Sequence, residues 1–252
     1  MSLTGSGRAL LAAGLLFAAL PPSSGFAQDP DALAGAKALF RDGGFVDAAT
    51  AAAALDNGPG YALAAEALAI YGHNRAPEDQ KQDLFKRCWG YAEKAILRDP
   101  GLSEAYLQHA HCMGRYAQTI GVLEALNQGF AERIKRALDK SLLLDPNKVG
   151  AYLSLGAWHA EIVASAGLLA GLLYDASEDD ALANYRRALE LAPDRADVHL
   201  EYAIGLLTLD DEQNRETALR ALRRALGLAP GDAYGQIVRE RAEKRLAKIN
   251  ER

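Results

Sequence analysis

The chain has 252 residues, of which 50% are hydrophobic, and carries a formal net charge of -5. This length and composition supply enough apolar surface for a sizeable buried core. The acidic balance argues against nucleic acid as a partner, because binding to a phosphate backbone requires an excess of positive charge.

The N-terminal segment has the pattern of a secretory signal peptide. Arg8 precedes a twelve-residue apolar run over 9–20, which is too short to span a bilayer and is followed by Pro-Pro-Ser-Ser-Gly. That tail disfavours the alternative, a buried N-terminal helix. Cleavage after Ala27 would leave 28–252 as one mature domain. We therefore expect a periplasmic protein with no membrane span and with a signal peptide at 1–27.

Four similar six-residue motifs, each ending in Asp-Pro or Ala-Pro, divide the mature chain. Each begins with a small residue followed by an aliphatic one, as in Ala-Ile-Leu-Arg-Asp-Pro, and their prolines are Pro100, Pro146, Pro193 and Pro230. The spacings between these prolines are 46, 47 and 37 residues. An internal repeat of helical segments, each ended by proline, explains this pattern.

The repeat matches the 34-residue tetratricopeptide (TPR) pattern, which needs large and small residues at fixed places in two helices. The clearest copy has these residues at Tyr152, Leu155, Gly156, His159, Ala181, Tyr185, Ala188 and Pro193. Other copies span 106–146 and 202–230, and two degenerate copies span 32–55 and 61–100. We predict an all-α, right-handed superhelical solenoid of about five helix pairs. A charged helix over 233–250 would cap its last apolar face.

The spacings exceed 34 residues because extra residues enter between the two helices of a pair, at 73–83, 118–129 and 164–179. We expect elongated helices with long caps that project from one edge. The Leu-rich stretch Ala166–Tyr174 is either buried against a neighbouring repeat or an exposed edge for a partner or an apolar ligand.

Cys88 and Cys112 lie twelve residues on either side of Pro100. Equal arms of one antiparallel hairpin would place them opposite each other, and a secreted protein folds in an oxidising compartment. We predict a disulfide that closes a loop of about 25 residues.

The first helix of each pair lines the inner groove of such a solenoid. In two copies its groove positions fall on Glu104, Leu107, His111, Arg115, Leu153, Ala157 and Glu161. Together with Trp158, and with Tyr174 of the insert, they form a candidate binding surface for a protein, a peptide or a small apolar or organic ligand. A solvated surface would carry the same residue types.

No pattern in the sequence indicates catalysis, a metal or a cofactor. His109 and His111 are two residues apart on a helix and point to opposite sides, whereas chelation needs a spacing of three or four. His109, His159 and His199 occupy repeat positions that pack helices together. Phosphate-binding, dinucleotide-binding and nucleophile-elbow motifs are missing. A hydrolase would depend on His111, and we do not expect one.

Four words over 157–203 are more specific than the general repeat: Ala-Trp-His-Ala-Glu, Leu-Leu-Tyr-Asp-Ala-Ser, Tyr-Arg-Arg-Ala-Leu-Glu-Leu-Ala-Pro and His-Leu-Glu-Tyr-Ala. With them the stretch 130–207 resembles bacterial TPR proteins akin to the regulator of microtubule dynamics and to the T component of TRAP transporters. This resemblance implies a curved, non-enzymatic solenoid, and for the transporter branch a partner that binds solute. That branch is typically lipidated, whereas residues 1–30 contain no cysteine. We therefore expect a binding adaptor or assembly scaffold, with an accessory component of solute uptake as the alternative.

Overall fold

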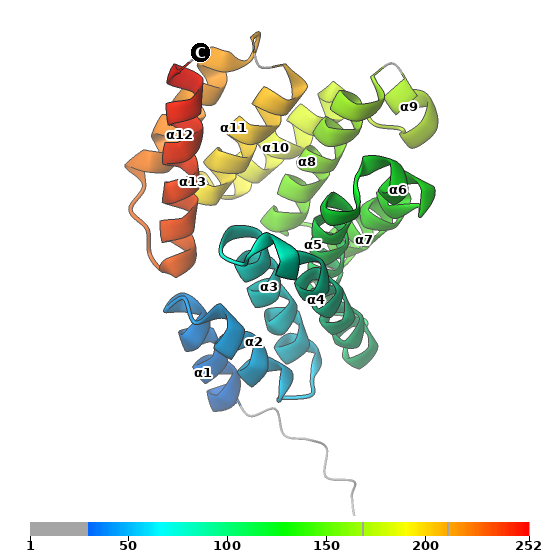
Figure 1. The fold of residues 1–252 in the computed structure, drawn as a ribbon, viewed down its shortest axis with the longest axis vertical. Coiled ribbons are helices and arrows are strands. Elements are labelled where there is room, and N and C mark those ends of the chain that lie inside the picture. Colours follow the sequence, from blue (N-terminus) through cyan, green and yellow to red (C-terminus); the bar gives the residue numbers. More distant parts are fainter. Residues whose placement is uncertain (1–29, 168, 211, 252) are drawn as a thin grey trace, which may run out of the picture.

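The computed structural model describes residues 30–167, 169–210 and 212–251 (Figure 1). The expected signal peptide at 1–27 lies outside the described residues. Within them the chain forms thirteen helices and no strand, so the predicted all-α class is confirmed. In the same part of the chain, no helix combines the length and the apolar character that a membrane crossing requires.

Ten of the helices form five antiparallel pairs, as the repeat predicts. The pairs are α1 (Pro30–Arg41) with α2 (Phe45–Ala53), α3 (Gly58–Asn74) with α4 (Glu78–Arg98), α5 (Ser103–Ile120) with α7 (Phe130–Leu144), α8 (Val149–Ala166) with α10 (Glu178–Leu191), and α11 (Ala196–Leu209) with α12 (Arg215–Gly227). The charged segment α13 (Ala233–Asn250) follows the last pair. The solenoid prediction is therefore confirmed.

Pro100, Pro146 and Pro193 lie at the corners between successive pairs, and Pro230 lies between the last pair and α13. Six residues after three of them, a side chain on the following helix contacts the carbonyl oxygen of the proline. Tyr106 donates to Pro100 at 3.3 Å and Tyr152 to Pro146 at 3.1 Å, and His199 Nε2 lies 2.7 Å from the Pro193 oxygen. His199 is consequently half-buried at a corner, rather than packed in the core as its repeat position suggested.

The small residues of the repeat lie where helices approach each other. Ala110, Ala203, Ala181, Ala188, Ala218 and Ala225 are all buried. The closest packing surrounds Tyr185, which is 1% exposed. A Cβ atom added to Gly156 of α8 would lie 3.0 Å from its ring, and one added to Gly205 of α11 would lie closer still. Two glycines on neighbouring inner helices therefore make the slot that this tyrosine fills.

The inserted residues take two forms. The first insertion lengthens α3 and α4 without adding a helix. The second and third add the short helices α6 (Val122–Asn127) and α9 (Leu169–Tyr174). Positive φ angles at Gly121 (89°) and Gly129 (67°) turn the chain into and out of α6.

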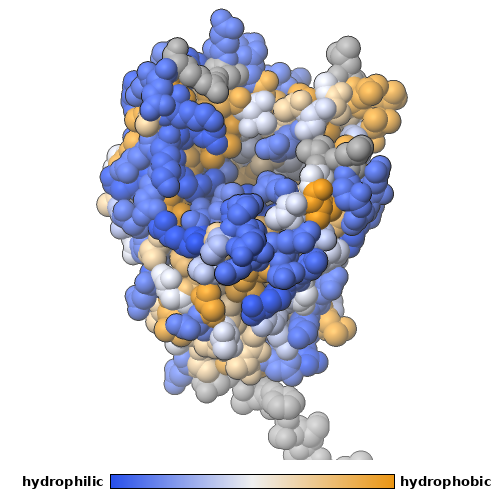
Figure 2. All heavy atoms as spheres, in the orientation of Figure 1, coloured by the Kyte–Doolittle hydropathy of each residue, from blue (hydrophilic) through white to orange (hydrophobic). Residues whose placement is uncertain are grey.

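The Leu-rich stretch is divided between core and solvent. On α9, Ala170 is buried and Tyr174 half-buried against the cluster around Trp158. Leu169, Leu172 and Leu173 are exposed, and they lie in the apolar patch over α9 in Figure 2. The first alternative, burial against a neighbouring repeat, is therefore wrong for these three leucines, because α9 turns Ala170 and part of Tyr174 toward the core.

Cys88 on α4 and Cys112 on α5 form a disulfide, with their Cα atoms 5.5 Å apart. Both residues are fully buried. The bond joins the second helix pair to the first helix of the third pair.

The solenoid curves so strongly that its two ends meet (Figure 1). Ile237 of α13 belongs to the same buried cluster as Phe45 of α2 and Leu63 of α3. Arg75, directly after α3, makes an ion pair with Glu240 of α13 at 2.9 Å. The capping helix therefore covers the last pair and also contacts the first two.

Candidate functional site

The inner helices α1, α3, α5, α8, α11 and α13 surround a hollow edged by hydrophilic residues (Figure 2). Groups on these helices interact electrostatically across it, although they are far apart in the sequence. The charged and polar groups that these interactions connect are Lys37, Glu66, His73, Glu104, His111, Arg115, Lys148, Arg195, Asp197, Glu201, Tyr234 and Arg241. The closure of the solenoid turns an open groove into this hollow.

Ion pairs fix part of the lining. Lys148, at the start of α8, lies 3.3 Å from Glu104 of α5, and Arg241 of α13 lies 2.8 Å from Glu201 of α11. Each pair joins two inner helices. These four side chains are 22–32% exposed, so water screens their attraction and each contact contributes little to stability. These ion pairs therefore matter for geometry rather than stability, because they fix the positions of the charged groups around the hollow.

His111 connects α5 to α8 inside the hollow. Its Nε2 lies 2.7 Å from Ser154 Oγ and its Nδ1 lies 3.4 Å from the amide oxygen of Gln108. Burial, and next the charge of Arg115, lower the pKa of His111 to about 4. A nucleophilic Ser-His pair needs a stronger base and usually a carboxylate behind it. We therefore interpret the contact as a structural link.

Arg115 and His73 lie in the part of the hollow near Arg241. Burial lowers the pKa of Arg115, and burial followed by the charges of Arg115 and Arg241 lowers the pKa of His73 to about 3. His73 is therefore neutral at physiological pH. Among the described residues the Arg115 guanidinium bonds only to the Gln118 side chain, at 3.1 Å. It thus makes no hydrogen bond or ion pair with a described carboxylate, although the charges of Glu201 and Glu161 act on it.

Glu66 of α3 faces the hollow and makes no hydrogen bond or ion pair with any described residue. Burial, and next the charge of Glu104, raise the pKa of its carboxyl group to about 7. Arg195, Lys148 and Lys37 oppose that shift. The group is therefore close to half ionised at neutral pH.

The Glu66→Gln variant should be more stable than the parent protein at about pH 8 and equally stable at about pH 4. The folded protein holds the Glu66 proton more tightly than the unfolded chain, whose ordinary value is 4.5. The stability from this group is therefore full below pH 4.5 and is lost as pH rises through about 7. Melting temperatures of both proteins across this range give the test. A difference that stays constant with pH would contradict it.

The structure divides the predicted groove residues into three sets. Glu104, His111 and Arg115 line the hollow. Leu107, Leu153 and Trp158 are 4%, 7% and 7% exposed and lie in the core between helices, so they offer no surface to a ligand. Leu107 fills the space beside Gly150, Leu153 packs against Tyr185, and the Trp158 indole donates to the Ala131 carbonyl at 2.9 Å.

The third set consists of Ala157, Glu161 and Tyr174, of which Ala157 is half-buried on α8. Glu161 is exposed on α8 and interacts electrostatically with Arg115, whereas Tyr174 packs on the Trp158 cluster away from the hollow. The histidines outside the hollow have structural partners. His109 accepts a hydrogen bond from the Trp89 indole at 2.8 Å, and the buried His159 accepts one from the Ser177 amide at 3.3 Å. No cluster of described His, Cys, Asp or Glu residues could hold a metal ion.

Several residues of the hollow were missed by sequence reasoning: Lys37, Glu66, His73, Arg195, Glu201, Tyr234 and Arg241. The two clear repeats supplied the predicted set, and these residues come from the degenerate first repeats, the last repeat and the cap. Charged residues on the inner faces of the first helices could have predicted them.

Comparison with known proteins identifies the family. A family model described as "Regulator of microtubule dynamics protein 1-3" matches residues 60–250. The chain belongs to this family. The match begins within α3 and ends at α13, so this regulator-of-microtubule-dynamics family member has one helix pair ahead of the matched region. Comparison with curated protein sequences gave no match.

Two solved structures are similar to this family member. A thermophilic TPR protein of Thermus thermophilus, TTC0263, is 18% identical with a TM-score of 0.60, over 85% of this chain and 98% of that one. YrrB, described as a TPR protein with an unusual peptide-binding site, is 17% identical with a TM-score of 0.40, over 87% of this chain and 93% of that one. The first likeness establishes the TPR fold.

Proposed function

We propose that this protein is a non-enzymatic periplasmic adaptor that binds an extended polar segment of a partner protein in its hollow. The observation that carries the proposal is that inner helices of all five pairs and the cap place charged side chains around one space. Stacked helix pairs of this kind present a long concave surface to a polypeptide.

The charges of the hollow define the kind of segment that fits. Ion pairs already neutralise Glu104 and Glu201, whereas Arg115 and Glu66 make no ion pair with a described residue and feel opposite charges only at longer range. A partially desolvated, unpaired charge is costly, and a partner group of opposite charge removes that cost. We infer that the segment carries an acidic residue for Arg115. An apolar ligand would leave these charges unpaired, so the lining disfavours it.

Two features support the periplasmic location. The pattern of residues 1–27 is that of a signal peptide, and the buried disulfide between Cys88 and Cys112 is a bond that persists in oxidising compartments. We propose a non-enzymatic function because His111 is a weak base. It is the residue on which the hydrolase hypothesis from the sequence depended.

The alternative is a ligand-binding accessory component of a TRAP-type uptake system. A cavity of about 460 Å³ beside α1 is the observation in its favour. Native mass spectrometry separates the two functions. A protein that co-purifies with the chain supports the adaptor, and a retained solute supports the accessory component.

Arg115→Ala should reduce the capture of the periplasmic partner about tenfold or more, because a charge-assisted bond to a partner carboxylate is lost. The measurement is quantitative mass spectrometry after crosslinking and affinity purification from periplasm. Arg186→Ala is the matched control, since Arg186 is exposed on the outer helix α10. Equal capture by both variants, with unchanged melting temperatures, would refute the proposed site.

A further inference from the structure

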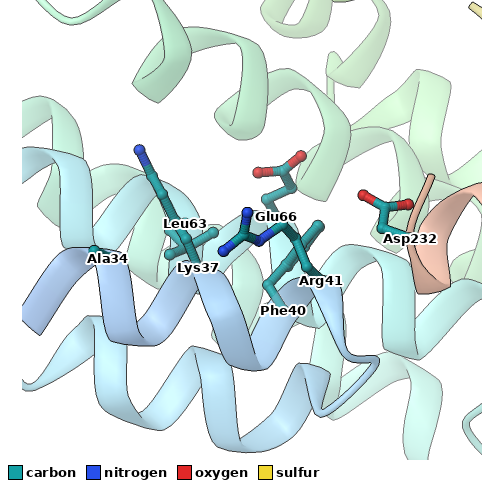
Figure 3. Close-up of a pocket in the computed structure, with 7 residues that line it drawn as sticks. All are labelled: Ala34, Lys37, Phe40, Arg41, Leu63, Glu66 and Asp232. Carbon is teal, nitrogen blue, oxygen red and sulfur yellow. The ribbon is translucent and has the colours of Figure 1, made fainter.

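A cavity of about 460 Å³ lies where the two ends of the solenoid meet (Figure 3). Helix α1 supplies Ala34, Lys37, Phe40 and Arg41, α3 supplies Leu63 and Glu66, and the residue before α13 is Asp232. Its volume falls in the range of pockets that hold small molecules. Helices α1 and α3 form most of its wall, and the residue before the capping helix completes it.

Three charged side chains around this cavity have no ion-pair partner within the described protein. Lys37 and Arg41 on α1 and Glu66 on α3 make no ion pair or side-chain hydrogen bond with any described residue. Asp232 differs, because its carboxylate accepts from the Gly235 amide at 2.7 Å and caps α13. The cavity therefore holds two cations and one carboxyl group that make no ion pair, although the charge of Lys37 acts on Glu66.

The uncharged walls lie between these charges. Phe40 and Leu63 border the cavity, and both pack in the buried cluster that α13 completes. Figure 3 shows Lys37 and Arg41 rising from α1 and Glu66 entering from α3. A ligand in this space would thus meet a cationic side, an acidic side and an apolar floor.

We propose that this cavity binds a small α-amino acid with an apolar side chain. The ammonium group donates to the carboxylate of Glu66, the ligand carboxylate accepts from Lys37 and Arg41, and the side chain covers Phe40 and Leu63. A zwitterion pairs with the two cations and with the carboxylate at once, which a purely anionic or cationic molecule of this size does not. This site goes beyond the adaptor role and does not require a protein partner.

Isothermal titration calorimetry of the mature chain at about pH 8 tests the assignment with three matched probes. L-leucine carries both charges, L-leucinamide lacks the carboxylate, and 4-methylpentanoate lacks the ammonium group. We expect saturable binding of L-leucine, with each of the other two at least about tenfold weaker, because each loses one charge-assisted contact.

Variants assign the two ends of the ligand. Glu66→Gln should weaken L-leucine about tenfold while leaving 4-methylpentanoate unchanged, and Arg41→Gln should bring L-leucine and L-leucinamide close to equal affinity. Glu243→Gln is the control, because Glu243 is exposed on α13 away from the cavity. Circular dichroism checks that each variant is folded.

Three outcomes would overturn the site: no saturable binding of L-leucine at millimolar concentration, equal binding of all three probes, or an L-leucine affinity that Glu66→Gln leaves unchanged. None of these concerns the capture of a protein partner by Arg115. The amino-acid site and the adaptor function therefore fail or succeed separately.

Discussion

Gly205→Ala should lower the free energy of unfolding by about 1 to 3 kcal/mol, because the added methyl group would overlap the ring of Tyr185. That ring is 1% exposed and also lies against Gly156 of α8, so a second helix restricts its movement. Helix propensity acts in the opposite direction, by up to about 1 kcal/mol in favour of alanine. The steric cost exceeds this gain.

Gly90→Ala is the matched control for this prediction. Gly90 also lies within a helix, α4, but a Cβ atom added there meets nothing within 4 Å. That variant should be stabilised by up to about 1 kcal/mol. Urea unfolding of the two variants gives both values. If Gly205→Ala proves as stable as the parent protein, the Tyr185 slot between α8 and α11 does not exist as described.

Loss of the disulfide should destabilise the mature protein by about 3 kcal/mol, through the greater freedom of the unfolded chain. For a protein of this size, that corresponds to a fall in melting temperature of about 6 to 12 °C. The bond connects Cys88 and Cys112 across 24 positions, and both residues are fully buried. The test is thermal unfolding of the Cys88→Ala/Cys112→Ala double variant beside the oxidised parent.

The oxidation state provides the control. Alkylation of the non-reduced parent protein, followed by mass spectrometry, should detect no free thiol. Two alkylated cysteines, or a double variant that melts with the oxidised parent, would contradict the account. The disulfide also holds α5 against α4, and α5 carries Glu104, His111 and Arg115 on its inner side.

The helix pairs could be predicted from the sequence because their signals are local. Each proline ends a helix by removing an amide donor, and buried alanines recur at repeat spacing, so the corners at Pro100 and Pro146 follow from the pattern alone. The pairing of Cys88 with Cys112 follows from their equal distance from one corner. These properties depend on a few neighbouring residues rather than on the whole superhelix.

The composition of the hollow could not be predicted in the same way. It depends on the curvature that accumulates over all five pairs and brings Tyr234 and Arg241 of α13 opposite Glu66 and Arg115. Counting positions from a helix start also placed Leu107 in the groove, whereas Gly150 leaves a space between pairs that this leucine fills. A glycine on one helix thus decides the environment of a residue 43 positions earlier.

The central claim is that the hollow, and not the outer surface, binds the partner. Site-specific photocrosslinking in periplasm tests this most directly, with the photoreactive residue placed at His111 on α5 or at Arg186 on α10. His111 lines the hollow and Arg186 is exposed on the outer helix. We predict a discrete protein adduct from position 111 and none from position 186. An adduct from position 186 alone would contradict the account.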